Sequence, residues 1–269
     1  MIQIPNYLDK LNDKIYICGI SGLMQKVHDD SGLSYRQAGN LLGFSADYYY
    51  KQLHSRNTFS IGFLKKIRQQ IDPSLFDKIY ANQHIFSTAR SRIVILPKEI
   101  SLDLAYFYGY LQGDGCLTSD KKGLSFTDEY LSQIEKINRL SKQLFGFSGH
   151  IYQKFGVHSK KWYYEVQIKS VVLNSFFHNV FGMNLGIKNN LKIPGLFLGD
   201  KSAYRFYLAG LFDADGTLPI NPDKAKQLFI DIAMKDKPFI ESINSELNLL
   251  GIETLPIYAR NSSSNFVSK

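Results

Sequence analysis

The sequence is poor in cysteine and has no long apolar run. Its 269 residues include only Cys18 and Cys116, which lie far apart in unlike surroundings, and its six histidines are scattered. Neither the cysteines nor the histidines have the spacing of metal ligands, which argues against a zinc site. A chain of this length needs no disulfide framework. No stretch approaches the roughly eighteen consecutive apolar residues of a transmembrane helix, and the amino terminus lacks the charged-then-apolar layout of a secretion signal. We therefore expect an intracellular protein, cytoplasmic or organellar, with no membrane partner.

Several catalytic motifs are absent as well. The sequence contains no Gly-x-Ser-x-Gly elbow, no glycine-rich phosphate loop followed by Lys and Ser or Thr, and no cysteine in a recognisable catalytic setting. Each of these motifs marks an activated nucleophile or a nucleotide-binding loop. Their absence disfavours those mechanisms for this chain.

Basic side chains are in excess. Lys and Arg outnumber Asp and Glu by 32 to 24, which gives a formal net charge of +8. Such an excess is compatible with a polyanionic partner such as nucleic acid. An apolar content of 44% and a charged content of 21% are ordinary for a soluble globular protein with an ample core.

Two segments, residues 107–115 and 208–216, are near-repeats. Each is an apolar helical run with small residues four positions apart, and each ends in Asp-Gly. The small residues are Gly109 and Gly113 in the first segment and Gly210 and Ala214 in the second. Residues four apart share a helix face, so each run offers a strip that another helix can approach closely. If the strips pack together, Asp114 and Asp215 lie side by side, and a shared divalent metal ion would offset their repulsion.

The repeated motif resembles that of the LAGLIDADG family of homing endonucleases. The second copy departs from the family's letters only at Phe212, while the first carries Tyr108, Tyr110 and Gln112 at variant positions. The final Asp-Gly is intact in both copies. The resemblance is to the double-motif, single-chain members. It implies an α+β fold of two pseudo-symmetric αββαββα units, in a monomer that binds double-stranded DNA.

The resemblance implies hydrolysis of phosphodiester bonds with Mg²⁺ or Mn²⁺. A metal ion held between carboxylates and a phosphate activates water and absorbs developing charge. Mg²⁺ prefers oxygen ligands, and a helix C-terminus carries partial negative charge, so Asp114 and Asp215 suit this role. The resemblance adds the carbonyl groups of Gly113 and Ala214 as ligands, and it assigns each aspartate to the cut of one strand.

The family also places a lysine near the metals, ahead of an Ile-Pro pair that leads into the second motif helix. In this sequence Lys192 directly precedes Ile193-Pro194 and is the nearest match, with Lys188 as the reserve. A cation there could stabilise the pentavalent phosphate or tune the water. The alternative interpretation is a surface lysine that caps a loop.

Residues 1–90 are predicted to form a small all-α domain, with a linker to about residue 100. Ser34 and Ser45 are typical N-caps, and a short helix between them ends at Gly43. This arrangement resembles the helix-turn-helix of small DNA-binding domains. The alternative is a plain three-helix bundle without a ligand. The residues of the second helix that we expect to contact DNA are Tyr48, Lys51 and Gln52.

Residues 101–192 and 193–269 are predicted to be two units with one order of elements. After its motif the first unit continues with a strand, a helix, a hairpin and a closing helix, at residues 124–127, 129–144, 151–169 and 171–181. The second unit repeats a strand, a helix and the start of another strand, at residues 228–234, 239–250 and 255–260. No closing helix follows. We therefore expect the second unit to be truncated at its carboxyl end by one strand and one helix.

Alternation along these strands predicts one polar, aromatic and cationic face. In the first unit the outward side chains are Ser125, Thr127, Tyr152, Lys154, Tyr163, Gln167 and Lys169; in the second they include Tyr258 and Arg260. Such a face on a curved ribbon suits the major groove of DNA. The plainer alternative is a half-solvated sheet.

Together these features favour a site-specific, Mg-dependent DNA endonuclease that cuts both strands of a long target. The alternative is a non-cleaving nucleic-acid binder on the same fold, either a transcription regulator or an intron RNA maturase. Retention of both final aspartates argues against that alternative. An intein that carries this nuclease is disfavoured, because the chain starts with Met1 and no His-Asn pair closes it.

Overall fold

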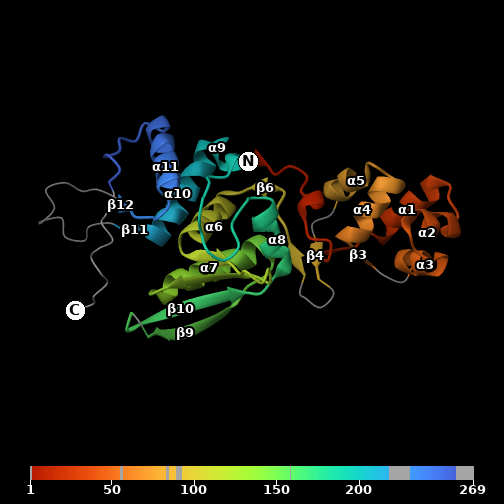
Figure 1. The fold of residues 1–269 in the computed structure, drawn as a ribbon, viewed down its shortest axis with the longest axis horizontal. Helices are drawn as coiled ribbons and strands as arrows, with labels where there is room; N and C mark the ends of the chain where they lie inside the picture. The colour runs from red at the N-terminus through yellow and green to blue at the C-terminus, as the bar shows by residue number, and fades with distance from the viewer. Residues whose placement is uncertain are drawn as a thin grey trace, which may run out of the picture.

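The molecule has an α+β fold, in a computed structural model that describes residues 2–54, 57–82, 85–88, 93–157, 159–217 and 231–258. Figure 1 shows an elongated shape, with the amino-terminal helices at one end, the first unit in the middle and the second unit at the other end. None of the described helices is both long and apolar enough to cross a membrane.

The two motif segments lie in helices that pack backbone to backbone. These helices are α6 (Leu102–Gly113) and α10 (Lys201–Asp215). A side chain at Gly109 would overlap the carbonyl oxygen of Tyr207, and a side chain at Gly210 would overlap that of Tyr106. The predicted pairing of small-residue strips is therefore confirmed, since only glycine allows so close an approach.

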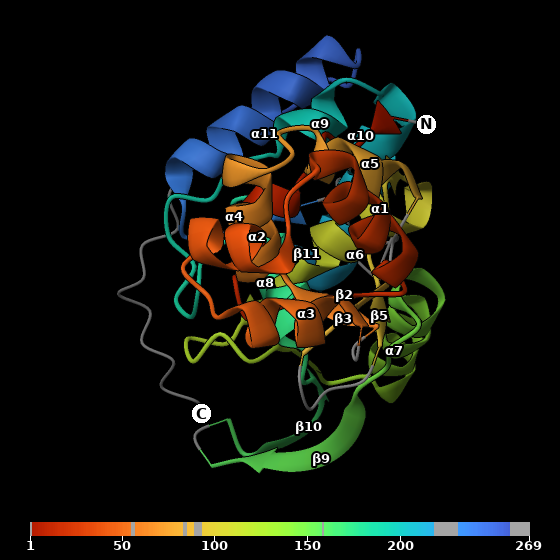
Figure 2. The ribbon, with the colours of Figure 1, turned by 90° about the vertical axis from the view of Figure 1, so that its right-hand side faces the viewer.

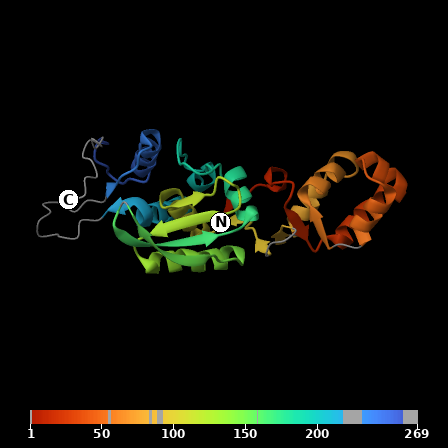
Figure 3. The same ribbon diagram turned by 60° about the horizontal axis from the view of Figure 1, so that its bottom comes forward.

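The first unit places a four-stranded antiparallel sheet over its helices. The strands, in spatial order, are β7 (Gly115–Leu117), β8 (Leu124–Asp128), β10 (Lys161–Ile168) and β9 (His150–Gly156). One face packs on α6, α7 (Leu131–Phe145) and α8 (Val171–Asn179), where the Phe107 ring contacts Phe126, Phe145 and Phe177. Figure 3 shows α7 along this face, and Figure 2 shows the long hairpin of β9 and β10 extending away from the amino-terminal helices.

The second unit repeats part of this order. Its elements are α9 (Gly195–Leu198), α10, β11 (Gly216–Thr217), β12 (Asp231–Ile232) and α11 (Lys237–Leu249). Helix α11 confirms the helix predicted at 239–250. Residues 255–258, predicted as strand, have no regular structure, because no strand in the described part of the chain lies beside them. Residues 228–230 and 259–269 lie outside the described residues.

The amino-terminal part is not all helical, which corrects the prediction for residues 1–90. Its helices are α1 (Ser21–Ser31), α2 (Tyr35–Leu42), α3 (Ala46–His54), α4 (Ile61–Gln70) and α5 (Leu75–Asn82), with a short 3-10 helix, η1 (Leu8–Lys10). They pack beside a sheet of order β3-β2-β4-β5, formed by β3 (Thr58–Ser60), β2 (Tyr16–Cys18), β4 (Ile85–Ser87) and β5 (Val94–Ile95). These strands are only two or three residues long, too short for an alternating pattern to reveal them. The predicted linker thus contributes strands of its own.

The two short helices predicted between residues 34 and 54 are present, as α2 and α3. Ser34 caps α2 in a reciprocal capping box with Gln37, and the Ser45 hydroxyl accepts the backbone N–H of Tyr48 at the start of α3. Gly43 ends α2 in the left-handed conformation, at φ 73°.

The amino-terminal residues also bind the first unit directly. Strand β1 (Ile2–Gln3) pairs with β6 (Glu99–Ile100), immediately before α6. The Asn12 backbone N–H donates to the Ser175 hydroxyl on α8 at 3.0 Å. The Tyr7 ring meets Phe176 of the same helix edge to face. One hydrophobic core therefore runs from the amino-terminal helices into the first unit.

The helix contact can be tested at Gly210. Gly210→Ala should lower the free energy of unfolding by about 3 kcal/mol or more, because its methyl group has no space against the Tyr106 carbonyl. Gly22→Ala in α1 is the matched control, since nothing lies within 4 Å of the added carbon. It should be neutral or stabilising by up to about 1 kcal/mol. Thermal and denaturant unfolding measure both; equal effects of the two variants would contradict the close contact.

Candidate metal and nucleic-acid site

Asp114 and Asp215 come together where α6 and α10 end. Asp114 is the residue that caps α6, and Asp215 is the last residue of α10. A side chain at Gly113 would lie against the methyl group of Ala214 and 3.2 Å from Asp215 Oδ2, which shows how closely the helix ends meet. The predicted juxtaposition of the two aspartates is therefore present.

Both carboxyl groups are shifted toward the protonated form. Burial, together with the charges of Asp215 and Asp128, raises the pKa of Asp114 to about 7, although the charge of Lys188 opposes the shift. Burial also raises the pKa of Asp215, and nearby Lys188 opposes that shift. Two half-buried like charges are costly without positive charge nearby. A cation at this point would therefore stabilise the ionised form of both carboxyl groups.

Lys188 supplies part of that positive charge. It lies on the loop between α8 and α9, and its ammonium group donates a hydrogen bond to the Gly113 carbonyl oxygen. Burial lowers the pKa of Lys188, while Asp215 and Asp114 act to raise it. The ammonium group thus lies at the end of α6, close enough to both carboxylates for their charges to act on it.

Lys192, the nearest match to the family pattern, is not at the aspartates. Its side chain is exposed, and only its backbone carbonyl takes part, accepting a hydrogen bond from Gln112 Nε2 at 3.0 Å. The lysine whose charge acts on both aspartates is Lys188, the reserve. The catalytic role of either lysine stays a prediction.

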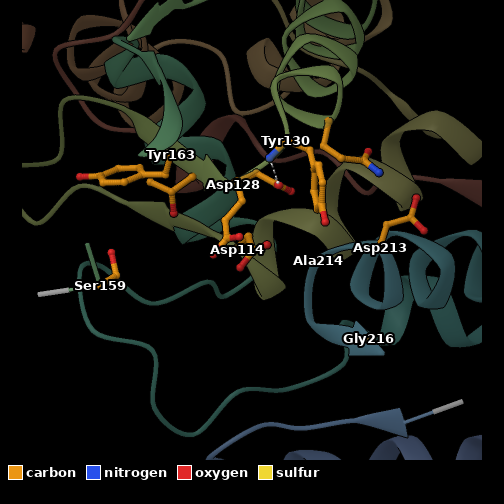
Figure 4. A pocket seen from close by; sticks show the side chains of 11 residues that line it. Asp114, Asp128, Tyr130, Ser159, Tyr163, Asp213, Ala214 and Gly216 are labelled. Atoms are coloured by element: carbon orange, nitrogen blue, oxygen red, sulfur yellow. Dashed lines mark hydrogen bonds between the residues drawn. The ribbon is translucent and has the colours of Figure 1, made fainter. Parts of the chain in front are cut away.

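A third carboxylate lies on the first-unit side of the pair. Asp128, at the end of β8, accepts the Tyr110 hydroxyl at 2.5 Å and the Tyr130 backbone N–H at 2.7 Å. Together with Asp114 it lines a cleft of about 690 Å³ between the start of α7 and the end of α10. Figure 4 shows Asp114 and Asp128 next to each other on the wall of this cleft. Nothing in the sequence pattern marked Asp128, because it ends a strand rather than a motif.

Two tyrosines tie the motif helices to each other in a reciprocal way. Tyr106 of α6 donates to Asp213 Oδ2 of α10 at 2.6 Å, and Tyr207 of α10 donates to Gln112 Oε1 of α6 at 2.5 Å. Lys136 of α7 binds both the Tyr106 hydroxyl and Asp213, on the more exposed side. On the buried side the neutral Gln112 replaces a carboxylate, so that no unpaired charge is buried there.

The oxygen atoms at the helix ends suit a hard divalent cation. Asp114 and Asp215 offer carboxylates, and the Gly113 and Ala214 carbonyls lie at the same point in the chain. The Gly113 oxygen has a second lone pair beyond the one used by Lys188. Within the described ranges no three His, Cys, Asp or Glu side chains form a cluster that could hold an ion alone. A cation here would therefore complete its shell with carbonyl, water or phosphate oxygens, as Mg²⁺ commonly does.

The sheet register places the predicted nucleic-acid contacts of the first unit on one face. Cross-strand pairs on this face are Thr127 with Glu165, Ser125 with Gln167, Lys154 with Tyr163, and Tyr152 with Glu165. Paired residues of an antiparallel ladder point to the same side. Lys169 follows on the same side, exposed just after β10. The first-unit set from the sequence thus forms one surface, opposite the face that packs on α7.

Sequence reasoning left out a buried acid at the centre of that surface. Glu165 is only 9% exposed, forms an ion pair with Lys154 and accepts Gln167 Nε2 at 2.5 Å. Alternation had put it on the outward face, but a carboxylate gave no reason to expect contact with a polyanion. Its role in the structure is to hold the two neighbouring donors in place.

The remaining predicted contacts divide into three cases. Tyr48 and Lys51 are exposed on α3. Gln52 is only 7% exposed and faces the core, because it lies three residues after buried Tyr49 on the same side of the helix; its prediction as a contact is wrong. Tyr258 is exposed but lies outside any sheet, and Arg260 falls outside the described residues.

Comparison with known proteins matches the motif-bearing regions of the chain. The family model of the LAGLIDADG-like domain matches residues 101–180 and 202–266, more than half of the chain. Domains of this family have a nucleic-acid-binding, nuclease-type fold. The uncharacterized protein MJ1054 of Methanocaldococcus jannaschii is 27% identical over 192 residues, which are 66% of this chain and 20% of that protein. The chain thus spans about a fifth of that relative's length.

The raised pKa of Asp114 predicts how pH affects stability. Without metal, the folded protein binds the Asp114 proton more tightly than the unfolded chain, whose pKa is near 3.8, so stability falls as the pH rises from about 4 to above 7. Asp114→Asn removes this cost. In a chelator at pH 8 the variant should be more stable than the wild type by on the order of 1–2 kcal/mol, a figure reduced for partial solvation. Near pH 4 the difference should vanish.

Thermal unfolding at several pH values measures this effect. Asp103→Asn, at the exposed start of the same helix, is the control and should give no gain at pH 8. A destabilising Asp114→Asn at pH 8 would show that the carboxyl group is not strained in the folded protein.

Proposed function

Because the chain belongs to the LAGLIDADG family, we propose that it is a site-specific DNA endonuclease that hydrolyses both strands of a duplex with Mg²⁺ or Mn²⁺. The observation that carries the proposal is the pair of half-buried carboxylates, Asp114 and Asp215, at adjoining helix ends, with the charge of Lys188 acting on both. A protein that only binds nucleic acid gains nothing from two partly buried acids beside a phosphate. One chain carries both acids, so we propose that it acts as a monomer.

The proposed ligands of the cation are the carboxylates of Asp114 and Asp215 and the carbonyl groups of Gly113 and Ala214. When bound, the cation would lower the pKa of water and offset the negative charge that develops on the phosphate. The contact between α6 and α10 fixes the two carboxylates relative to each other before DNA arrives. Such preorganisation costs no rearrangement at the moment of reaction.

Lys188 has two roles in this proposal. Without DNA its ammonium group balances part of the charge of the two carboxylates. With DNA present, the same group would face the scissile phosphates and stabilise the extra negative charge of the transition state. Its hydrogen bond to the Gly113 carbonyl group fixes its position relative to the α6 terminus.

The outward sheet face of the first unit is the proposed DNA-reading surface. Its donors and aromatic rings can approach base edges in the major groove. Hydrogen bonds and apolar contacts to those edges are what distinguish one base pair from another. Helix α3, with exposed Tyr48 and Lys51, is a proposed second contact. If it binds, the length of DNA protected from a nuclease should shrink at one end in Lys51→Glu.

A non-cleaving binder, either a transcription regulator or an intron RNA maturase, is the alternative. It would use the same sheet face and would need neither aspartate.

Cleavage can be tested on a supercoiled plasmid library with randomised inserts, from which linearised molecules are recovered. We expect linear products only with Mg²⁺ or Mn²⁺. Asp114→Asn and Asp215→Asn should each slow cleavage by about 100-fold or more, because the charge that holds the cation is lost. Affinity for the recovered duplex in a gel shift should survive, and Asp103→Asn should cut normally. A wild-type protein that selects sequences by binding yet never cuts them would establish the binder instead.

The two lysines give a matched pair. Lys188→Ala should reduce the cleavage rate by about 100-fold, the usual effect of removing one preorganised charge from a transition state. Lys192→Ala changes a neighbouring lysine in the same loop and should cut at nearly the wild-type rate. Strand cleavage of the recovered site at saturating protein measures both. A larger loss in Lys192→Ala would return the role to the residue that the family pattern indicates.

A further inference from the structure

The hairpins that follow the two motif helices can be compared position by position. Each begins at the glycine after its aspartate: Gly115 pairs with Phe126 in the first unit, and Gly216 pairs with Ile232 in the second. Asp128 and Met234 each lie two residues beyond those partners. The acid at the first helix end therefore has a thioether as its counterpart at the second.

The residue that binds Asp128 is also polar in the first unit and apolar at the corresponding position of the second. Tyr110 donates its hydroxyl hydrogen to Asp128 Oδ2 and lies four residues before Asp114. Four residues before Asp215 stands Leu211. A tyrosine–carboxylate pair in the first unit is thus replaced by leucine and methionine in the second. Both members of the pair differ, so the first unit has a hydrogen-bonded polar pair where the second has two apolar residues.

Asp128 is held firmly and still has acceptor capacity. Its two oxygens each accept one hydrogen bond, from the Tyr110 hydroxyl and the Tyr130 backbone N–H. A carboxylate offers about four acceptor positions, which leaves roughly two. Asp128 also lines the cleft on the Asp114 side (Figure 4). The charge of Asp128 acts on Asp114, so the two carboxylates lie close together in this cleft.

We infer that Asp128 is a positioning residue for the cut served by the first unit, and that the two strands are therefore cut at different rates. The inference rests on the proposed endonuclease function. A free oxygen of Asp128 accepts a hydrogen bond from the attacking water and orients it toward phosphorus. The water oxygen forms the new P–O bond as the bond to the leaving sugar oxygen breaks. One proton passes from the water to solvent, and the leaving oxygen takes one up.

The corresponding residues of the second unit cannot orient water in this way. Met234 carries no charge and is a weak acceptor, and Leu211 has no hydrogen to donate. At these two positions the cut served by the second unit receives no help. The expected consequence is that a duplex nicked in one strand accumulates before the double-strand break.

The experiment uses the full-length protein and a recovered target duplex with a different fluorophore on each strand. In the wild type one strand should be cut about 10-fold faster, and Asp128→Met, which copies the second unit, should slow that strand by about the same factor. The other strand should change by less than about 2-fold, so that the ratio of rates approaches one. Tyr110→Phe keeps the ring but not the hydroxyl group, and should shift the ratio in the same direction.

The control is Glu129→Gln. Glu129 lines the same cleft but is exposed and paired with Lys161, so its loss should leave the ratio unchanged. A merely structural effect of Asp128→Met would slow both strands alike, and that result would overturn the inference, as would equal rates in the wild type. If Asp128→Met fails to fold, Tyr110→Phe decides the question. If no recovered DNA is cut on either strand, the proposed function itself fails, and the inference fails with it.

Discussion

The contact between the backbones of α6 and α10 is the constraint on which the rest of the molecule depends. Gly109 and Gly210 let each helix reach the carbonyl groups of the other, and no larger residue would fit at either position. That contact fixes the distance between Asp114 and Asp215 and the direction in which each following hairpin leaves its helix. The two aspartates, the sheet face and the cleft therefore all take their positions from two glycines.

The close approach of the helices also brings like charges together, and the two units offset these charges with different residues. Lys188 enters from one loop and offsets part of the charge of both aspartates. Gln112 replaces an acid where the helix pair is buried, while its counterpart Asp213 forms an ion pair with Lys136. The repeated motif thus gives both units the same helix end, and the residues that differ between the copies make the two units chemically different.

Much of this could be predicted from local sequence patterns. Small residues four apart predicted the helix contact, Asp-Gly predicted the helix ends, and alternation around Trp162 predicted one face of the sheet in register. Lys188 could not be chosen over Lys192, because the loop that carries them has no periodicity. The short strands beside Ile17 and the inward turn of Gln52 were missed since both depend on tertiary packing. Asp128 became visible only when the hairpin register was known.

The central claim is that Asp114 and Asp215 share a divalent cation, and titration calorimetry of the DNA-free protein with Mn²⁺ tests it most directly. The account predicts one binding event of the wild type that weakens at least about tenfold in Asp114→Asn and equally in Asp215→Asn, since both carboxylates hold the same ion. Binding that survives unchanged in the double variant, or that responds to only one of the two substitutions, would contradict it.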